Sequence, residues 1–178
     1  RLRMIHVFRD PVGNIFEQNK RNFGDRIGVD PRELQLTFLW KNQPVPLMAL
    51  GLEEEYLIAN STERLIMMVN AMYHKNINGF LTLDQGHREN VLFLEFEDFV
   101  VNPKDYLDAL ENFVGDKFGK AKSRILKREK CPRIIDPNER LHRIKEIQKN
   151  ISPKYNVMLE ELINDYDQKK WLKWKNFK

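Results

Sequence analysis

The sequence is poor in cysteine, glycine and proline, and it has no long apolar run. Of its 178 residues, one is cysteine, eight are glycine and eight are proline. A single cysteine, Cys131, excludes an internal disulfide and favours a reducing, cytoplasmic compartment. The longest apolar run, Leu65 to Val69, is far shorter than the roughly 20 residues of a membrane span, so no membrane segment is visible. We therefore expect residues 1–178 to form a single globular domain.

The sequence also lacks the residue spacing of a metal site or of a phosphate-binding loop. No histidine has a partner four residues on or a cysteine pair nearby, so no metal is expected; the four are His6, His74, His87 and His142. The stretch Gly119 to Ser123 is superficially similar to a phosphate-binding loop. That pattern needs a glycine where this chain has Val114, and Ser or Thr where it has Ala121.

Basic residues are concentrated in one part of the chain. The net charge is +4, but the segment from Lys117 to Lys149 holds 12 Lys and Arg against 4 Asp and Glu. This excess predicts an anionic partner, although a solvated basic helical face is the alternative. Nucleic-acid binding would rest on the pI of about 9.1 alone, without any recognition motif, so no nucleic-acid partner is expected.

The first half of the chain predicts a strand, a tight turn and helices. The apolar run Met4 to Phe8 favours a strand buried on both faces, as in a parallel sheet. A helix is expected from Asn14 to Arg21. Residues 22–51 carry several Gly and Pro and predict an irregular crossover with a helical patch from Arg32 to Trp40. Helical spacing of apolar residues follows from Glu53 to Tyr73, where the two adjacent methionines are expected to fill the core.

The second half of the sequence again predicts a strand followed by helices. Val91 to Phe96 is the second clear strand, and Asn102-Pro103 then starts a helix that ends at Gly115. Ser152-Pro153 starts another helix, with an apolar stripe through residue 166. The pattern predicts an α/β protein with a partial parallel sheet flanked by helices. Two strands are few for a sheet, and we expect the chain to be the C-terminal portion of a larger domain.

Arg9 is the first candidate binding residue. In open parallel sheets, ligands bind beyond the carboxyl ends of the strands, and Arg9 directly follows such an end. The helix start after it offers free N–H groups and a positive dipole end, which favour a phosphate. Arg9 would add bidentate hydrogen bonds. The alternative is a local ion pair of Arg9 with Asp10 or another carboxylate.

Three blocks of sequence resemble the sulfotransferase family. Met-Ile-His-Val-Phe-Arg-Asp-Pro, from Met4 to Pro11, resembles the strand and turn with which these enzymes hold the 3′-phosphate of 3′-phosphoadenosine 5′-phosphosulfate. The block from Asn90 to Gly115 is similar to a later strand, acidic turn and helix of the same family. Pro153-Lys154-Tyr155-Asn156, with the apolar residues that follow it, is similar to a helix near the C-terminus of many bacterial and carbohydrate sulfotransferases.

The resemblance implies a P-loop NTPase-like sulfotransferase fold and transfer of a sulfuryl group to a hydroxyl or amine of an acceptor such as a carbohydrate. The donor, 3′-phosphoadenosine 5′-phosphosulfate, would be a co-substrate, with Arg9 on its 3′-phosphate. The family's loop for the 5′-phosphosulfate and its usual catalytic base are not found in residues 1–178. The catalytic residues therefore stay unknown, and the chain alone is expected to be incomplete and inactive.

Glu17 departs from the family pattern. Eight residues after the arginine, the family typically has a serine that also binds the 3′-phosphate, whereas this chain has Glu17. A carboxylate about 4 Å from a phosphate would repel it by a few kcal/mol. Either Glu17 turns towards Lys20 and Arg21 on its own helix, or the donor site has decayed.

The alternative function is a catalytically inactive sulfotransferase-like protein that holds an acidic glycan or another anion with the basic segment. Cys131 is expected to have no catalytic role, because direct sulfuryl transfer needs no thiol. The run from Trp174 to Phe177 shares only part of a late binding segment of the family's cytosolic members, and packing of this tail on the core is the simpler interpretation.

Overall fold

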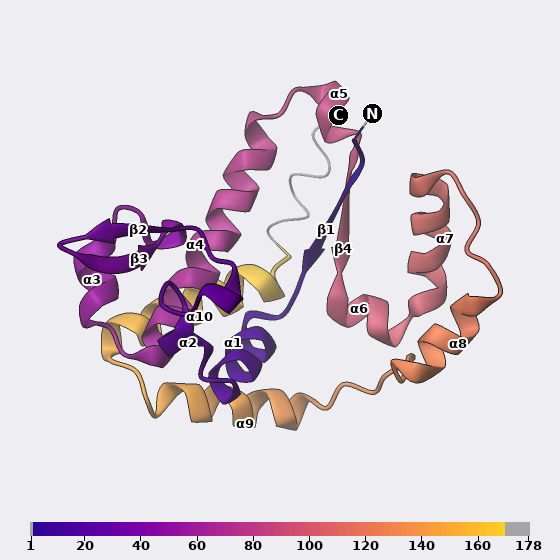
Figure 1. The fold of residues 1–178 in the computed structure, drawn as a ribbon. Coiled ribbons are helices and arrows are strands. Elements are labelled where there is room, and N and C mark those ends of the chain that lie inside the picture. Colours follow the sequence, from indigo (N-terminus) through magenta and orange to yellow (C-terminus); the bar gives the residue numbers. More distant parts are fainter. Residues whose placement is uncertain (1, 170–178) are drawn as a thin grey trace. The chain divides into compact units, whose positions relative to one another are not determined.

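The computed structural model describes residues 2–169, which form two compact units (Figure 1). Unit 1 consists of the residues up to Asp10 together with Leu83–Pro137. Unit 2 consists of Pro11–Thr82 together with the residues from Asn138 onward. The architecture is mixed α/β, as predicted, with a small parallel sheet and a separate antiparallel pair of strands. Among the helices of residues 2–169, none is both long enough and apolar enough to cross a membrane.

Unit 1 is built around two parallel strands that are far apart in sequence. β1 pairs with β4 in parallel, in a register that runs from Met4 opposite Val91 to Phe8 opposite Glu95. The small core of this unit includes Phe8, Phe93 and Leu94. The elements of unit 1 are β1 (Met4–Phe8), α5 (Gln85–Arg88), β4 (Val91–Glu95), α6 (Phe96–Val101), α7 (Pro103–Val114) and α8 (Ala121–Arg128).

The burial predicted for β1 is wrong, although its position and its parallel pairing are confirmed. Met4, Ile5 and Val7 are each between 43% and 51% exposed. The reason is that the sheet has only two strands within residues 2–169, so β1 lies at an edge. The second strand is also one residue shorter than predicted, because Phe96 already belongs to α6.

Two of the signals predicted for α7 are confirmed, Pro103 at the start and Gly115 at the end, whereas the side chain of Asn102 makes no capping hydrogen bond. Pro103 occupies the first turn. Gly115 ends the helix in the left-handed region at φ 83°, where glycine carries no steric penalty. Its N–H donates to the carbonyl of Glu111 at 2.9 Å.

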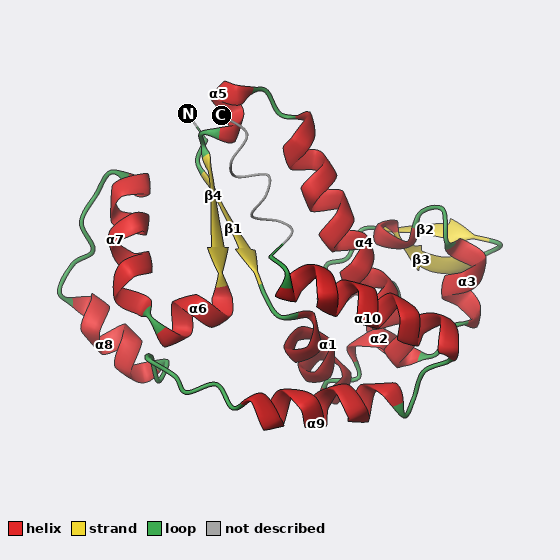
Figure 2. Cartoon of the chain, turned by 180° about the vertical axis from the view of Figure 1, so that it is seen from behind, coloured by secondary structure: helices red, strands yellow, loops and turns green. Residues whose placement is uncertain are grey.

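Unit 2 contains the larger core, to which helices from both ends of the sequence contribute. The helices themselves can be followed in Figure 2. Met67 and Met68 are buried in it, as predicted, and so is the apolar stripe of the last helix, including Leu159 and Leu162. The elements of unit 2 are α1 (Pro11–Lys20), α2 (Phe23–Arg26), η1 (Pro31–Glu33), β2 (Thr37–Trp40), β3 (Gln43–Pro46), η2 (Leu47–Ala49), α3 (Glu53–Ile58), α4 (Ser61–Thr82), α9 (Pro137–Gln148) and α10 (Pro153–Asp167).

The helical patch predicted from Arg32 to Trp40 is wrong for most of its length: only Arg32 and Glu33 are helical, in the short η1, whereas Thr37–Trp40 form the first strand of a β-hairpin. β2 pairs antiparallel with β3, and Trp40 lies opposite Gln43. Lys41 and Asn42 connect the strands with φ values of 47° and 63°, and positive φ at both central residues is typical of a type I′ turn. The Thr-Phe-Leu-Trp sequence of β2 has the β-branched and aromatic composition of a strand.

The helical region predicted from Glu53 to Tyr73 is divided into α3 and α4 by a cap at Asn60. The Asn60 side chain accepts the N–H of Glu63 at 3.0 Å, and the Glu63 carboxylate accepts the N–H of Asn60 at 3.0 Å. Such a reciprocal pair defines a helix start. Glu63 also accepts the N–H of Ser152 at 2.8 Å. Burial opposes ionisation of Glu63, but these N–H donors outweigh it and lower the pKa of the carboxyl group.

Candidate functional site

The carboxyl ends of β1 and β4 lie at one edge of the parallel sheet and present a cation and an aromatic ring. Because Phe8 and Glu95 are paired at the strand ends, Arg9 and Phe96 are the next residues along this edge. The Arg9 side chain is exposed, and its Cζ lies 5.2 Å from the centroid of the Phe96 ring. This is a cation–π distance, so the ring holds the guanidinium at the edge of the sheet.

A second guanidinium lies over the same ring. Arg133 comes from the loop after α8, and its Cζ lies 5.9 Å from the Phe96 centroid. The Arg133 backbone N–H donates to the carbonyl of Val100 at 2.7 Å. Its side-chain Nε and Nη2 donate to the carbonyl of Glu129 at 3.3 and 2.9 Å. These bonds fix Arg133 within unit 1.

The two guanidinium groups are not neutralised within the described chain. Neither Arg9 nor Arg133 forms an ion pair with a carboxylate of residues 2–169, so the expected alternative of a local ion pair for Arg9 is not seen there. Two like charges that share one ring favour an anion between or beside them. Guanidinium groups donate paired hydrogen bonds to phosphate or sulfate oxygens.

Glu17 lies in unit 2, whereas Arg9 lies in unit 1. The Glu17 carboxylate is 3.8 Å from Lys20 Nζ, the ion pair expected along its own helix. Its second partner is Arg143 of α9, with Nη2 at 3.7 Å. Arg21, the other expected partner, forms no ion pair with Glu17 among the described residues. The carboxylate of Glu17 is thus balanced by two cations of its own unit.

Several residues of these two clusters are not identified by the sequence analysis. Phe96 could have been found by the rule that selects Arg9, because it also directly follows a parallel strand. Arg133 carries no local signal beyond its place in the basic segment. Arg143 also packs over the Phe16 ring, with its Cζ 5.1 Å from the centroid, and only tertiary structure brings it to α1.

The basic segment from Lys117 to Lys149 is partly neutralised and extends over both units. Arg140, for example, pairs with Asp167 at 2.8 Å. On and beside α8, in contrast, Lys120, Arg124 and Lys127 are exposed and form no ion pair within residues 2–169. Their spacing of four and three residues places them on one helix face.

Glu111 of α7 binds the start of the basic segment through ion pairs and a backbone hydrogen bond. Its carboxylate is buried and accepts hydrogen bonds from Lys117 Nζ at 3.0 Å, from Lys122 Nζ at 3.1 Å and from the N–H of Phe118 at 3.1 Å. These three donors lower the pKa of Glu111 to about 2. The effect of Lys117 is the largest, followed by those of Lys122 and of the N–H of Phe118.

We expect the stability of the protein to depend on Glu111 at acidic pH. A carboxyl group with a pKa lowered to about 2 stabilises the fold fully above its ordinary pKa of roughly 4.3, and this contribution is lost as pH falls towards 2. Urea unfolding followed by circular dichroism at pH 6, 4 and 2.5 measures it. Between pH 4 and 2.5 the wild type should lose more stability than Glu111→Gln, which cannot titrate. Equal losses would contradict the assignment.

The remaining chemically active side chains form no catalytic cluster among the described residues. His87 Nδ1 lies 2.7 Å from the carboxylate of Asp84 at the start of α5. His6 packs against the Phe8 ring, and burial lowers its pKa. Cys131 Sγ lies 3.7 Å from the carbonyl of Glu129. In residues 2–169, no three His, Cys, Asp or Glu side chains are grouped as metal ligands would be.

The prediction that the tail from Trp174 to Phe177 packs on the core concerns residues outside those that the structure describes.

In comparisons with known proteins, no protein-family model, no curated protein and no solved structure matches this chain.

Proposed function

We propose that this chain is part of a sulfotransferase that transfers a sulfuryl group from 3′-phosphoadenosine 5′-phosphosulfate to a hydroxyl or amine of an acceptor such as a carbohydrate. The P-loop NTPase-like sulfotransferase fold is part of the same proposal. The observation that carries it is the edge of the parallel sheet, where the guanidinium groups of Arg9 and Arg133 lie over Phe96 without a carboxylate partner in residues 2–169. The three sequence blocks in the family's order support it.

In this proposal Arg9 and Arg133 donate hydrogen bonds to the 3′-phosphate of the donor, and Phe96 keeps their planes in place. The acceptor oxygen or nitrogen attacks sulfur while the bond from sulfur to the 5′-phosphate oxygen breaks. A base takes the acceptor proton, and adenosine 3′,5′-bisphosphate leaves. Positioning of the donor and stabilisation of charge on the leaving phosphate supply most of the rate, as in phosphoryl transfer. The base and the 5′-phosphosulfate loop are not assigned to residues 1–178.

Calorimetry with the desulfated product tests the donor site. The full-length protein is titrated with adenosine 3′,5′-bisphosphate and, as a control, with adenosine 5′-monophosphate, which lacks the 3′-phosphate. We expect saturable 1:1 binding of the bisphosphate at least about tenfold tighter than of the control, because each charge-assisted pair is worth roughly 1.5–3 kcal/mol. Equal affinities would contradict a 3′-phosphate site.

Residues 1–178 alone should show no transfer activity, because neither a phosphosulfate loop nor a base is identified in them. The measurement is incubation with labelled donor and a panel of hydroxyl acceptors. Turnover above the blank would mean that the active site lies within this chain and has been misplaced.

The second candidate function is an inactive sulfotransferase-like protein that binds an acidic glycan. The exposed cations Lys120, Arg124 and Lys127 on one face of α8 favour it. In the full-length protein, salt-dependent heparin binding without turnover supports this function. Turnover that is unchanged by Lys120→Gln and Arg124→Gln supports the enzyme instead.

A further inference from the structure

Two guanidinium groups form the proposed donor site, and only that of Arg9 directly follows a strand. Arg133 lies in the loop after α8, and its guanidinium reaches the Phe96 ring from there. Its Nη2 donates to the carbonyl of Glu129 at 2.9 Å, and Glu129 is the residue that caps the end of α8. The direction in which the Arg133 side chain points therefore depends on where α8 lies.

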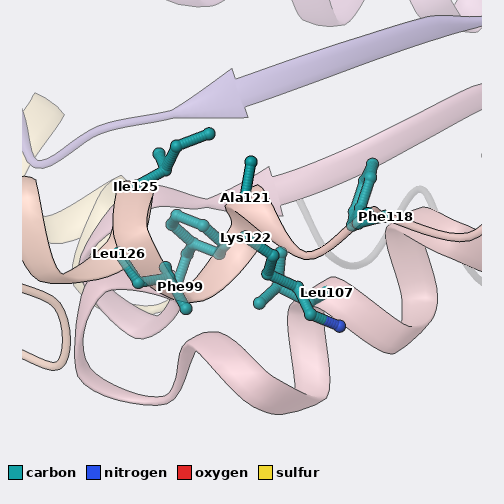
Figure 3. Close-up of a pocket in the computed structure, with 8 residues that line it drawn as sticks. Phe99, Leu107, Phe118, Ala121, Lys122, Ile125 and Leu126 are labelled. Carbon is teal, nitrogen blue, oxygen red and sulfur yellow. The ribbon is translucent and has the colours of Figure 1, made fainter.

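Apolar packing holds α8 only loosely on the rest of unit 1. None of its residues is buried. An apolar hollow of about 290 Å³ lies between α8 and the helices α6 and α7 (Figure 3), and the side chains around it include Phe99 of α6, Leu107 of α7 and Ile125 of α8. Ile125 remains 46% exposed. Because a side chain that faces a gap loses van der Waals contacts there, other interactions must fix the position of this helix.

The start of α8 is held by one buried carboxylate. Glu111 of α7 is only 6% exposed. Its Oε1 accepts hydrogen bonds from Lys122 Nζ of α8 and from the N–H of Phe118, both at 3.1 Å. Its Oε2 lies 3.0 Å from Lys117 Nζ. A buried carboxylate is costly without such partners, so Glu111 fixes the first turn of α8 on α7.

The helix itself connects Glu111 to Arg133. The N–H of Glu129 extends α8 by donating to the carbonyl of Ile125 at 2.9 Å. The backbone of Arg133 is anchored separately, because its N–H donates to the carbonyl of Val100 on α6 at 2.7 Å. A displacement of α8 therefore moves the Glu129 carbonyl away from the guanidinium of Arg133 and changes its direction, while the backbone of Arg133 stays on α6.

We propose that Glu111 is a positioning residue of the donor site: by fixing α8 it holds the Glu129 carbonyl, and with it the Arg133 guanidinium, where the 3′-phosphate of the donor binds. This role rests on the proposed function. Glu111 does not contact the donor, and its effect passes through Arg133. The negatively charged Glu111 thus favours the binding of an anion.

Glu111→Gln keeps the shape of the side chain and removes its charge. In calorimetry of the full-length protein, it should weaken binding of adenosine 3′,5′-bisphosphate by roughly three- to tenfold, the range for a residue that acts through a chain of contacts. The direction of the change is diagnostic, because loss of a negative charge would by electrostatics alone tighten the binding of an anion. Unchanged or tighter binding would overturn the proposal.

A double-mutant cycle tests whether Glu111 acts through Arg133. In the Arg133→Ala protein, Glu111→Gln should change the bisphosphate affinity by less than about twofold, because the group that it positions is absent. Equal losses in the wild-type and Arg133→Ala backgrounds would mean that Glu111 acts on another part of the protein, and would overturn the proposal.

Lys122→Met is a second variant, which leaves the buried carboxylate and its bond to Lys117 in place. It releases α8 from Glu111 and should weaken bisphosphate binding by roughly threefold or more. Lys127→Met removes an exposed cation of the same helix that does not bind Glu111, and should change the affinity by less than about twofold. Equal effects of the two variants would mean a diffuse attraction of the anion to α8 and would overturn the proposal.

A measurement without ligand separates this inference from the proposed function. The Nε–H of Arg133, which donates to the Glu129 carbonyl at 3.3 Å, is followed by nuclear magnetic resonance and assigned by its loss in Arg133→Ala. In Glu111→Gln it should exchange with solvent at least about threefold faster. An unchanged rate would overturn the positioning role even where the bisphosphate binds. Faster exchange in a protein that does not bind the bisphosphate would support the hold of Glu111 on Arg133 and would overturn the donor site.

Discussion

Arg9→Ala is expected to weaken binding of adenosine 3′,5′-bisphosphate to the full-length protein by about 10- to 150-fold. The substitution removes a charge-assisted, bidentate donor worth roughly 1.5–3 kcal/mol. Arg9→Lys should fall between alanine and the wild type, because lysine keeps the charge but loses the planar fork. Arg21→Ala is the matched control: it removes one exposed arginine and should change affinity less than about twofold.

Glu17→Ser tests what the resemblance to sulfotransferases implies for position 17. It removes a negative charge and restores a hydroxyl donor where the family has one, so bisphosphate binding should become tighter. If Arg9→Ala weakens binding and Glu17→Ser leaves it unchanged, Glu17 is already held by Lys20 and Arg143 and the donor site is intact without the serine. If Arg9→Ala leaves the affinity unchanged, the turn is structural and the resemblance to sulfotransferases is one of fold only.

Gly24→Ala is expected to destabilise the protein by about 1–3 kcal/mol or more, the range for overpacking in a tight interior. A Cβ at this position of α2 would lie 2.1 Å from the carbonyl oxygen of Ser61 and 2.6 Å from its Oγ. The backbone at the start of α4 would have to move. Gly24 is buried, so the new methyl group has no route to solvent.

Gly79→Ala is the matched control for Gly24→Ala. Gly79 lies within α4, and an added Cβ there meets nothing within 4 Å. Alanine in a helix interior is more favourable than glycine by roughly 0.5–1 kcal/mol. Urea unfolding of the two variants should therefore shift the midpoint in opposite directions. A Gly24→Ala protein as stable as the wild type would contradict the close approach of α2 to α4.

The elements predicted correctly are those whose signals are local and mutually consistent. The continuous apolar runs of β1 and β4, and the start and stop residues of α7, are sufficient by themselves. The β2–β3 hairpin was not predicted because its turn, Lys41-Asn42, lacks the glycine that usually marks a two-residue turn. A helical patch is predicted from Arg32 to Trp40 instead, since short apolar runs do not distinguish helix from strand.

The candidate site was predicted only in part, for a different reason. Arg9 is found from its place after a strand, which is a property of the neighbouring sequence. Arg133 and Arg143 reach Phe96 and Glu17 from far along the chain, and no local pattern encodes such contacts. The expected pairing of Glu17 with Lys20 on one helix is seen, whereas the ion pair with Arg143 depends on how α9 packs.

The two units are interleaved along the chain, and this has a consequence for the order in which they are completed during synthesis. β1 is made before its partner β4, and all of residues 11–82 lie between them. In the folded protein, Leu159 of α10 packs in the same core as Leu65 and Met67 of α4. This face of α4 cannot be covered by α10 until residues 83–137 have been made. A nascent chain that ends before Asn138 therefore exposes the apolar face of α4, a state prone to aggregation.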